Sequence, residues 1–346
     1  MTAAFVHDAP SQRVVFGDGA LGRIETETTS LGIRRALVVA TPGSGERLGE
    51  KVTALLGANA AGLHARAVIH VPRDIAEAGL AAAREADADG LVAIGGGSAI
   101  GLAKYIARET GLPIVAVPTT YSGSEATPIW GMSEGERKTT GRDTRVLPRT
   151  VLYDPQLTLD LPPAVTAASA MNAMAHCISA LWIVDRTPVN VAFSTEAMRR
   201  FGQFLPRAVA GGHDVEARSE CLIGAWLAGT VLGGGTGLNH KFAHVLGGYG
   251  LPHAETHAVL LPHTTRFNLC SGGDAPERLA ETLQSADPAG ALDKMIAAFG
   301  IPRRLRQLGF EESKIADAAE QIAALKIKAP RPVSRADAEN ILRAAL

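Results

Sequence analysis

The sequence predicts a two-domain protein, in which an α/β domain with a parallel sheet is followed by an all-α helical bundle. Its 346 residues exceed what one hydrophobic core usually fills. In the first half, short apolar runs alternate with helical patterns, which is typical of a parallel sheet covered by helices. Beyond residue 161 the pattern is almost wholly helical. We therefore expect an α/β domain over residues 1–161 and a helical domain over residues 162–346.

Each predicted strand of the first domain is a short apolar run that ends near a glycine, a proline or a helical segment. The strands are expected at residues 13–17, 35–40, 65–72, 90–97, 112–120 and 146–155, and the helices at 18–32, 45–58, 74–86 and 98–111. Residues 132–143 are polar and rich in turn formers. In the second domain, long helical patterns cover residues 163–184, 188–211 and 215–233, followed by shorter helices rich in Ala and Leu.

Two loops of the first domain predict a nucleotide site. A buried strand ends in the motif LVAIGGGSAIGLAK, where three glycines and a serine stand at the start of a helix. Glycines let backbone N–H groups approach an anion, and a helix N-terminus carries partial positive charge. The next strand ends in the hydroxyl-rich loop PTTYSGSE, and open α/β sheets bind ligands at the carboxyl ends of their strands. The alternative for the first loop is a turn needed only for packing.

A second glycine motif, Gly17–Gly22, formally matches GxGxxG. A Rossmann site of that type needs an Asp or Glu at the end of the second strand, about 20 residues on. That strand ends in Thr41 and Pro42 instead. We therefore interpret Gly17–Gly22 as a tight turn.

The stretch Gly237–His263 is the most concentrated candidate site, since it holds half of the ten histidines. His240 and His244 are four residues apart, which places both on one face of a helix. His253 follows a turn containing Gly and Pro, so its imidazole can fold back towards the other two. The alternative is that these residues are ordinary core histidines with hydrogen-bond partners inside the protein. The crowding of five histidines and the helical spacing of two of them argue against it.

Composition excludes several classes of partner. The net charge is −1 and 20% of the residues are charged, so no strong field favours nucleic acid or a membrane surface. Small molecules and other copies of this chain are the expected partners. Cys177, Cys221 and Cys270 are isolated from one another, and we expect reduced, buried thiols. The N-terminus has no basic segment followed by an apolar one, so we expect a soluble cytoplasmic protein.

Motifs spread in order over nearly the whole chain resemble those of the iron-containing alcohol dehydrogenase superfamily. They are RVVFG, GGGSAIGLAK, PTTYSGSEATPIWG, KTTGRDTRVLPRTVLYDP, NAMAHC, HKFAHVLGG with LPHAETHAVLLPH, and PRPVSRADAENILRAAL. YSGSE, KTTGRD and HKFAHVLGG make the match closest to the maleylacetate reductases within it. The resemblance implies a dinucleotide-binding α/β domain joined to a helical catalytic domain, the architecture that dehydroquinate synthase shares.

Metal-dependent members of the superfamily hold Fe²⁺ or Zn²⁺ with an Asp and three histidines. The matching positions here are Asn172, His176, His240 and His253, with His244 as a neighbouring histidine. A carboxamide thus replaces the only anionic ligand. Neutral ligands hold a hard divalent cation much less firmly, so we expect a site that works without metal.

The resemblance implies that NADH or NADPH delivers hydride to the double bond of maleylacetate, giving 3-oxoadipate in the breakdown of aromatic and chlorinated aromatic compounds. Hydrogen-bond donors can stabilise the enolate that forms. We assign that role, and protonation of the enolate carbon, to His240 and His244, with His176 as a further candidate. His253 and Asn172 would complete the pocket. For the carboxylates of the substrate, Lys241 is a candidate partner, as are Arg142 and Arg145.

For the cofactor, the resemblance assigns the phosphates to Gly96, Gly97 and Ser98. It assigns the nicotinamide or its ribose to Thr119, Thr120, Ser124 and Lys138. Thr41 and Pro42 stand where an acidic residue would favour NADH, so nothing there repels the 2′-phosphate of NADPH. We therefore expect both cofactors to be used, by a chain that forms homodimers as members of this family commonly do.

Two departures bear on the substrate pocket, and three other functions stay open. The segment from His244 to His253 is one residue shorter than the usual pattern, and Asn239 stands where the reductases commonly have His. One alternative is a metal-dependent alcohol or hydroxy-acid dehydrogenase, which metal analysis and EDTA would reveal. A second is a non-redox lyase of the dehydroquinate synthase type, whose zinc ligands are more charged. A third is a binding protein with an inactive site.

Overall fold

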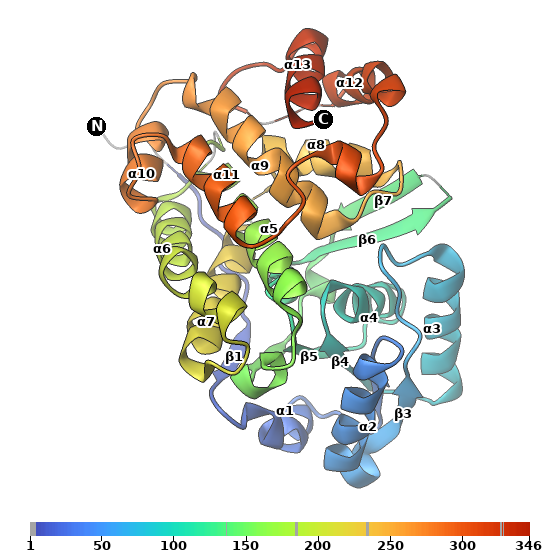
Figure 1. The fold of residues 1–346 in the computed structure, drawn as a ribbon. Helices are drawn as coiled ribbons and strands as arrows, with labels where there is room; N and C mark the ends of the chain where they lie inside the picture. The colour runs from blue at the N-terminus through green and yellow to red at the C-terminus, as the bar shows by residue number, and fades with distance from the viewer. Residues whose placement is uncertain (1–4, 136, 184–185, 233–234, 326, 328) are drawn as a thin grey trace. The chain divides into compact units, whose positions relative to one another are not determined.

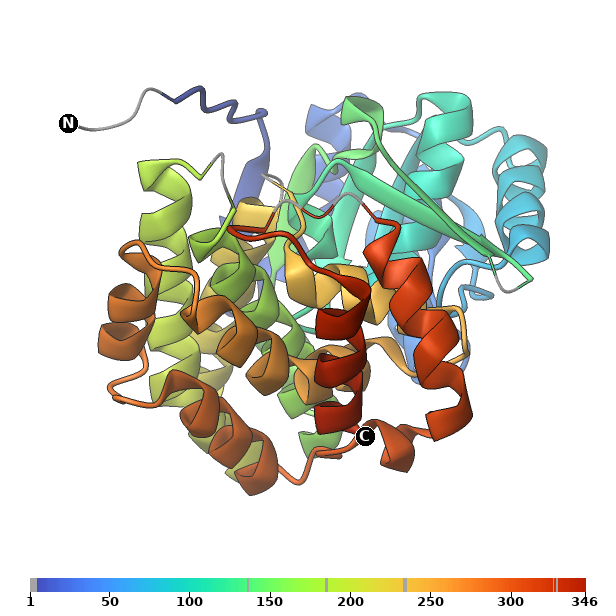
Figure 2. The ribbon, with the colours of Figure 1, turned by 90° about the horizontal axis from the view of Figure 1, so that it is seen from above.

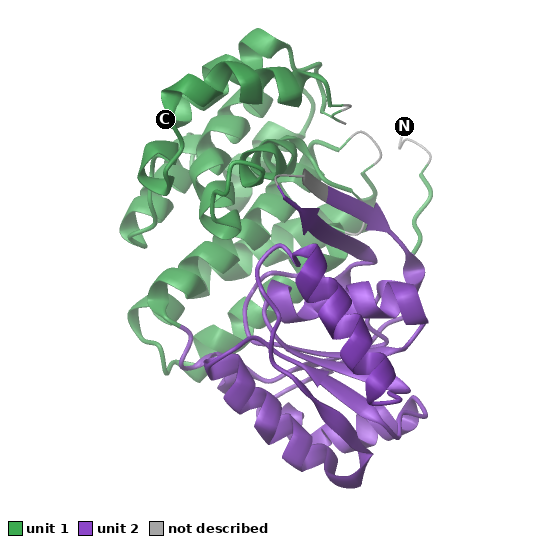
Figure 3. Ribbon diagram, turned by 90° about the vertical axis from the view of Figure 1, so that its right-hand side faces the viewer, with its two compact units in different colours: residues 1–8, 162–346 green, residues 9–161 purple. Residues whose placement is uncertain are grey.

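The computed structural model describes residues 5–346 except 136, 184–185, 233–234, 326 and 328, and excludes the side chains of residues 137 and 138. The chain forms two compact units (Figure 3). One unit is Ala9–Leu161, and the other consists of residues 162–346 with the N-terminal segment through Asp8. The sequence assigns that segment to the α/β domain. Its attachment to the helices includes a contact of 3.3 Å between His7 Nδ1 and Thr187 Oγ1.

The α/β unit, residues 9–161, is built on a six-stranded, wholly parallel sheet, as predicted (Figure 1). Its strands are β1 (Arg13–Phe16), β2 (Ala36–Val39), β3 (Ala60–His64), β4 (Gly90–Gly95), β5 (Ile114–Pro118) and β8 (Thr150–Tyr153), in the order β1-β8-β5-β4-β2-β3. The helices of this unit are α1 (Ile24–Ser30), α2 (Ser44–Leu56), α3 (Arg73–Glu85) and α4 (Gly97–Thr110).

Both faces of this sheet are buried, which explains why its central strands are continuous apolar runs. In β4, Leu91 and Ala93 belong to one hydrophobic cluster, whereas Val92 and Ile94 belong to the other. Successive side chains of a strand point to opposite faces, so each face receives alternate residues. The first cluster includes residues of α3 and α4, and the second includes residues of α1 and α2.

Two predictions for this unit are wrong. The third strand is Ala60–His64 rather than residues 65–72. Residues His70 and Val71 adopt positive φ angles of 66° and 50°, which end any extended run before Pro72. Much of the turn-rich segment after residue 128 forms an antiparallel hairpin, β6 (Ile129–Glu134) and β7 (Arg137–Arg142). Strand β6 carries Ile129, Trp130 and Met132 but is only half-buried, and the described side chains of β7 are polar and mostly exposed. Neither strand shows the regular apolar alternation that a sequence pattern could detect.

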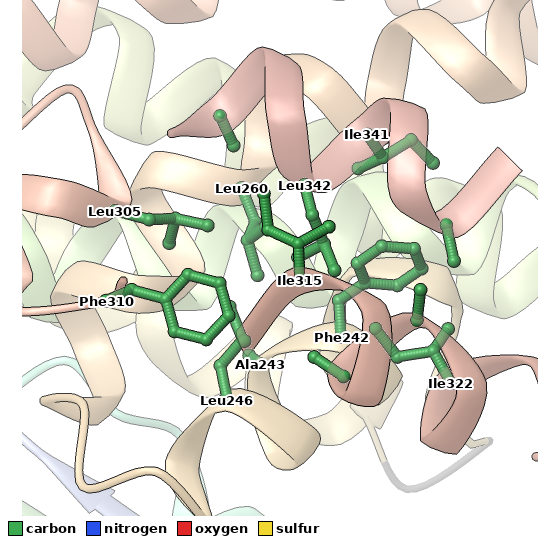
Figure 4. Close-up of a cluster of buried hydrophobic side chains, with 14 of the residues drawn as sticks. Phe242, Ala243, Leu246, Leu260, Leu305, Phe310, Ile315, Ile322, Ile341 and Leu342 are labelled. Atoms are coloured by element: carbon green, nitrogen blue, oxygen red, sulfur yellow. The ribbon is translucent and has the colours of Figure 1, made fainter. Parts of the chain in front are cut away.

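The other unit, which contains residues 162–346, is helical. Its helices are α5 (Pro163–Leu181), α6 (Pro188–Ala210), α7 (Val215–Leu232), α8 (Leu238–Gly247), α9 (His253–Leu269), α10 (Ala275–Thr282), α11 (Pro288–Ala298), α12 (Ile315–Ala323) and α13 (Arg335–Ala345). Helices α12 and α13 lie side by side in red at the C-terminal end of the chain (Figures 1 and 2). Together with α8 and α9 they enclose a hydrophobic core that includes Phe242, Leu260 and Leu342 (Figure 4).

Helix α5 is the central element of this unit, because nearly every side chain from Thr166 to Leu181 is buried. Among the described residues, this one helix is long and apolar enough to cross a membrane, but 89% of that stretch is buried inside the protein, as in a core helix. Cys177 on α5 and Cys221 on α7 are buried free thiols, as predicted. Cys270 is exposed, so the prediction fails there, because it lies just past the last turn of α9.

Candidate active site

The glycine loop between β4 and α4 forms an open helix N-terminus. Gly95 has a φ of 138°, which turns the chain from the strand into the helix. Gly96 precedes the first turn without a side-chain cap, Gly97 is exposed, and Ser98 is half-buried. The first N–H groups of an α-helix have no partner within the helix. The loop therefore offers backbone donors and partial positive charge to an anion, as the sequence predicts for a phosphate.

The hydroxyl-rich loop after β5 lies directly beside the glycine loop. The Thr119 N–H donates to the carbonyl of Gly95 at 3.1 Å. A Cβ atom placed on Gly96 would lie 2.9 Å from Cγ2 of Thr120, so glycine is required for the close approach of the two loops. The structure thus brings Gly96, Gly97 and Ser98 to the same edge of the sheet as Thr119 and Thr120.

A buried lysine holds the next part of this loop. Lys104 on α4 is fully buried, and its ammonium group donates to the carbonyl oxygens of Ser124 at 2.6 Å, Thr127 at 2.8 Å and Ile129 at 2.9 Å. Burial lowers the pKa of Lys104 to about 7. Nearby, Glu125 is also fully buried and accepts a hydrogen bond from the hydroxyl of Tyr153 at 2.9 Å. Ser124, a predicted cofactor contact, therefore has a fixed backbone.

The other predicted residues of this unit lie on separate elements. Thr41 and Pro42 follow β2, next to β4 in the sheet, and the Thr41 hydroxyl packs on the first turn of α2 at Gly45. Lys138 belongs to β7, but its side chain is outside the described part of the chain. Arg142 is exposed at the end of β7. The guanidinium of Arg145 donates to both carboxylate oxygens of Asp143, so a local partner compensates its charge.

The helical unit gathers histidines from three helices. His176 on α5 lies 4.6 Å from His240 on α8, measured between ring centroids. His240 in turn lies 4.3 Å from His257 on α9 and 6.2 Å from His244. His253 completes the group at 4.6 Å from His257 and 6.1 Å from His244. The predicted gathering of His176, His240, His244 and His253 is thus present in the structure. We call these four residues together with His257 the histidine cluster.

The backbone explains how α8 reaches α5. A Cβ atom on Gly237, the residue before α8, would lie 2.8 Å from Cβ of Ser179. Ser179 is one turn beyond His176 on α5, so the missing side chain at 237 lets the start of α8 pack closely there. His240 follows three residues later, in the first turn of α8. At the other end, Gly250 with a φ of 82° turns the chain towards Pro252 and α9.

Burial keeps the inner histidines uncharged. It lowers the pKa of His176 to about 3. It also lowers the pKa values of His240 and His257 well below the usual range, and neighbouring imidazoles and Lys241 lower that of His240 further. His244, His253 and Lys241 are half-buried. The interior of the cluster is therefore neutral near pH 7.

The inner residues have hydrogen-bonding capacity that the protein does not use. Nδ1 of His176, both ring nitrogens of His240 and Nε2 of His257 are buried without a hydrogen-bond partner. Oδ1 of Asn172, one turn before His176 on α5, is also buried without a hydrogen-bond partner. Buried polar groups are rarely left unpaired, and such groups at one place indicate where a ligand with polar atoms binds.

The sequence prediction did not include His257 or the contacts of Asn239 among the site residues. His257 is central to the cluster, and the Nδ2 amide of Asn239 lies 3.1 Å from its Nδ1. The available signal was the spacing of His253 and His257, four residues apart, which repeats that of His240 and His244. A contact between Asn239 on α8 and His257 on α9 has no local signature in the sequence.

Comparison with known proteins identifies the family. Residues 10–155 match the model of the iron-containing alcohol dehydrogenases, and residues 166–346 match the C-terminal model of the Fe-containing alcohol dehydrogenase family. The chain belongs to the iron-containing alcohol dehydrogenase family. The predicted family is therefore confirmed.

Several relatives within this family are named maleylacetate reductases. The chain is 48% identical to maleylacetate reductase 2 of Cupriavidus pinatubonensis, over 96% of this chain and 94% of that protein. It is 42% identical to maleylacetate reductase of Pseudomonas sp. strain P51, over 99% and 97%. The crystal structure of maleylacetate reductase from Agrobacterium tumefaciens matches with a TM-score of 0.94 at 39% identity, covering 100% of this chain and 99% of that one.

Iron, which the family name implies, does not fit the donor set of this chain. Asn172, His176, His240 and His253 are all neutral ligands, whereas a hard divalent cation favours carboxylates. The ring contacts of His253 are with His244 and His257, while His176 contacts His240. Across the described residues, no three His, Cys, Asp or Glu side chains are arranged to hold a metal ion. The unpaired atoms fit a hydrogen-bonded organic ligand better.

Proposed function

We propose that this protein is a maleylacetate reductase, which uses NADH or NADPH to reduce the carbon–carbon double bond of maleylacetate to 3-oxoadipate. The observation that carries the proposal is the neutral histidine cluster with Asn172 beside it. It supplies hydrogen-bond donors without an anionic metal ligand. The full-length similarity to maleylacetate reductases supports the same reaction.

Hydrogen-bond donors suffice for the chemistry of this reaction. The double bond of maleylacetate is conjugated to a ketone, so hydride from the nicotinamide adds to the carbon farther from the ketone. The electron pair of the double bond then moves towards the ketone oxygen and gives an enolate. Donors aimed at this oxygen stabilise the charge as it develops, and their effect is large where water is excluded. A proton added to the other carbon completes the reduction.

The histidines differ in burial, and this difference indicates which of them stabilises the enolate oxygen and which protonates the carbon. His240 and His176 are buried and neutral, and a neutral imidazole is a poor acid but a good N–H donor. We therefore assign the stabilisation of the enolate oxygen to these two residues. His244, on the same face of α8 as His240 and half-buried, is our candidate for the proton donor to carbon. His253 and Asn172 would complete the pocket.

The substrate carries two carboxylates and needs cationic partners. Lys241 is half-buried beside His240, which suits a carboxylate held at the rim of the cluster. Arg142 and Arg145 are weaker candidates, and the ion pair of Arg145 with Asp143 competes with a substrate for its guanidinium.

We further propose that the protein is a cytoplasmic homodimer that acts in the catabolism of aromatic compounds.

The cofactor would lie along the carboxyl edge of the sheet. The open N-terminus of α4 at Gly96, Gly97 and Ser98 suits the pyrophosphate. Thr119, Thr120, Ser124 and Lys138 are assigned to the nicotinamide half. At the end of β2, Thr41 and Pro42 present no carboxylate to the adenosine ribose, so a 2′-phosphate is tolerated. We expect kcat/KM values for NADH and NADPH within about a hundredfold of each other.

The proposal is tested by following the loss of NADH absorbance with freshly prepared maleylacetate and identifying the product by mass spectrometry. Turnover that yields 3-oxoadipate supports it. A second candidate, a metal-dependent alcohol dehydrogenase, is favoured by the family and by the unpaired Oδ1 of Asn172. Turnover of simple alcohols or hydroxy acids with NAD⁺, abolished by EDTA, together with no activity on maleylacetate, would establish that alternative.

A further inference from the structure

His257 is a fully buried histidine that neither the sequence motifs nor the proposed mechanism assign to a task. Its ring is 0% exposed and lies between the rings of His240 and His253, at 4.3 and 4.6 Å. One of its nitrogens, Nδ1, has a partner in the protein, whereas the other, Nε2, has none. A ring that is held on one side and unpaired on the other suits an oriented contact with a ligand.

The orientation of the Asn239 amide follows from the backbone of His257. The side chain of Asn239 approaches the carbonyl oxygen of His257 at 3.3 Å and its Nδ1 at 3.1 Å. A carbonyl oxygen can only accept, so the group facing it must be the NH₂ of the amide. The amide oxygen then points to the hydroxyl of Thr264, which donates to it at 3.0 Å. Turning the amide over would place two acceptor oxygens face to face.

The tautomer of His257 follows from this orientation. An amide NH₂ can only donate, so the Nδ1 that lies 3.1 Å from it must be the acceptor of this hydrogen bond and carries no proton. A neutral imidazole has one N–H, which is then at Nε2. The unpaired atom of His257 is thus a donor.

The geometry points to His257 as a hydrogen-bond donor to the substrate, held in the Nε2–H tautomer by Asn239. The ligand group is an acceptor oxygen, either the ketone or a carboxylate of the dicarboxylate substrate, so the inference rests on the proposed function. His257 is a binding residue, while Asn239 acts through it as a positioning residue. Asn239 thus serves a specific hydrogen bond in this chain.

The test begins with two substitutions of His257. Leucine removes the donor with little change of volume, and His257→Leu is expected to lower kcat/KM for maleylacetate by about tenfold to a hundredfold, as for one lost hydrogen bond to an ionised oxygen. The KM for NADH is expected to stay unchanged. His257→Gln can place an amide N–H near the former Nε2 and is expected to restore part of the loss. Thr265→Val is the matched control, because Thr265 is a buried residue of the same helix whose hydroxyl has no partner.

The positioning role of Asn239 needs a measurement that a loss of stability would not imitate. In protein carrying ¹⁵N-labelled histidine, the resonances of His257, assigned with the Gln variant, report which nitrogen holds the proton. We expect a protonated Nε2 and a bare Nδ1 in the wild type, and a mixture of tautomers in Asn239→Leu with a loss in kcat/KM of about threefold to tenfold.

Two results would overturn the inference: a protonated Nδ1 on His257 of the wild type, or full kcat/KM in His257→Leu. The proposed function fails separately, when the wild type does not reduce maleylacetate. In that case the nitrogen resonances alone still decide whether Asn239 fixes the tautomer. Folding of each variant is checked by its far-ultraviolet circular dichroism, and the spectra of the wild type require no variant to fold.

Discussion

Replacing Gly237 with alanine is expected to separate His240 from His176. The added Cβ would lie 2.8 Å from Cβ and 3.1 Å from Oγ of Ser179, well inside ordinary contact distance. Relief requires α8 to move away from α5 by up to about 1 Å, since the side chain of Ser179 branches from a buried helix. Overpacking of this kind costs about 1–3 kcal/mol of stability. A shift of about 1 Å in a catalytic group can lower the rate about a hundredfold.

The assay combines denaturant unfolding with the kinetics of NADH oxidation by maleylacetate. Gly237→Ala is expected to lower both the free energy of unfolding and kcat/KM, while Ser179→Gly in the same chain removes the colliding atom and restores much of both. Gly247→Ala, at the other end of α8, is the matched control, because a Cβ there meets nothing within 4 Å. Wild-type stability and activity in Gly237→Ala, or a double variant no better than the single one, would refute the reasoning.

Three further predictions concern the cofactor loop, the metal and pH. Gly96→Ala puts a Cβ 2.9 Å from Thr120 and should raise the KM for NADH about tenfold or more, measured at saturating maleylacetate; an unchanged KM would contradict the loop assignment. Asn172→Asp supplies an anionic ligand and should raise the affinity for Zn²⁺ about tenfold, measured by competition with a chromophoric chelator. Burial lowers the pKa of His176 to about 3, so the unfolded chain takes up a proton first as the pH falls. The stability that the neutral His176 contributes to the folded state is complete above about pH 6.5. It is lost as the pH falls towards 3, at about 1.4 kcal/mol per pH unit. A denaturant midpoint that does not decrease when the pH is lowered from 7 to 5 would contradict this prediction.

Much of the fold could be predicted because its physical causes are local. Strands such as β4 are buried on both faces and therefore appear as continuous apolar runs. The edge strand β3 pairs with β2 alone, begins with three small residues and is mostly half-buried, so the nearby apolar run at 65–72 gives the stronger but misleading signal. Strand β7 is polar, and β6 has no regular apolar alternation although it carries Ile129, Trp130 and Met132, so the hairpin is not evident from the sequence.

The site could be predicted within each helix but not between helices. The spacing of His240 and His244 fixes a shared face, and the motif containing Asn172 and His176 does the same on α5. Which rings touch depends on helix packing, which here depends on the missing side chain of Gly237. The bond from Asn239 to His257 joins two helices across a turn, and no pattern in the sequence specifies it.

The central claim is that this chain reduces maleylacetate with a neutral hydrogen-bonding cluster in place of a metal centre. The most direct measurement is the rate of NADH oxidation by maleylacetate before and after prolonged dialysis against EDTA, with the metal content of the same samples determined. The account predicts an unchanged kcat and far less than one Fe or Zn per chain. A stoichiometric metal whose removal abolishes turnover, and whose return restores it, would contradict the account.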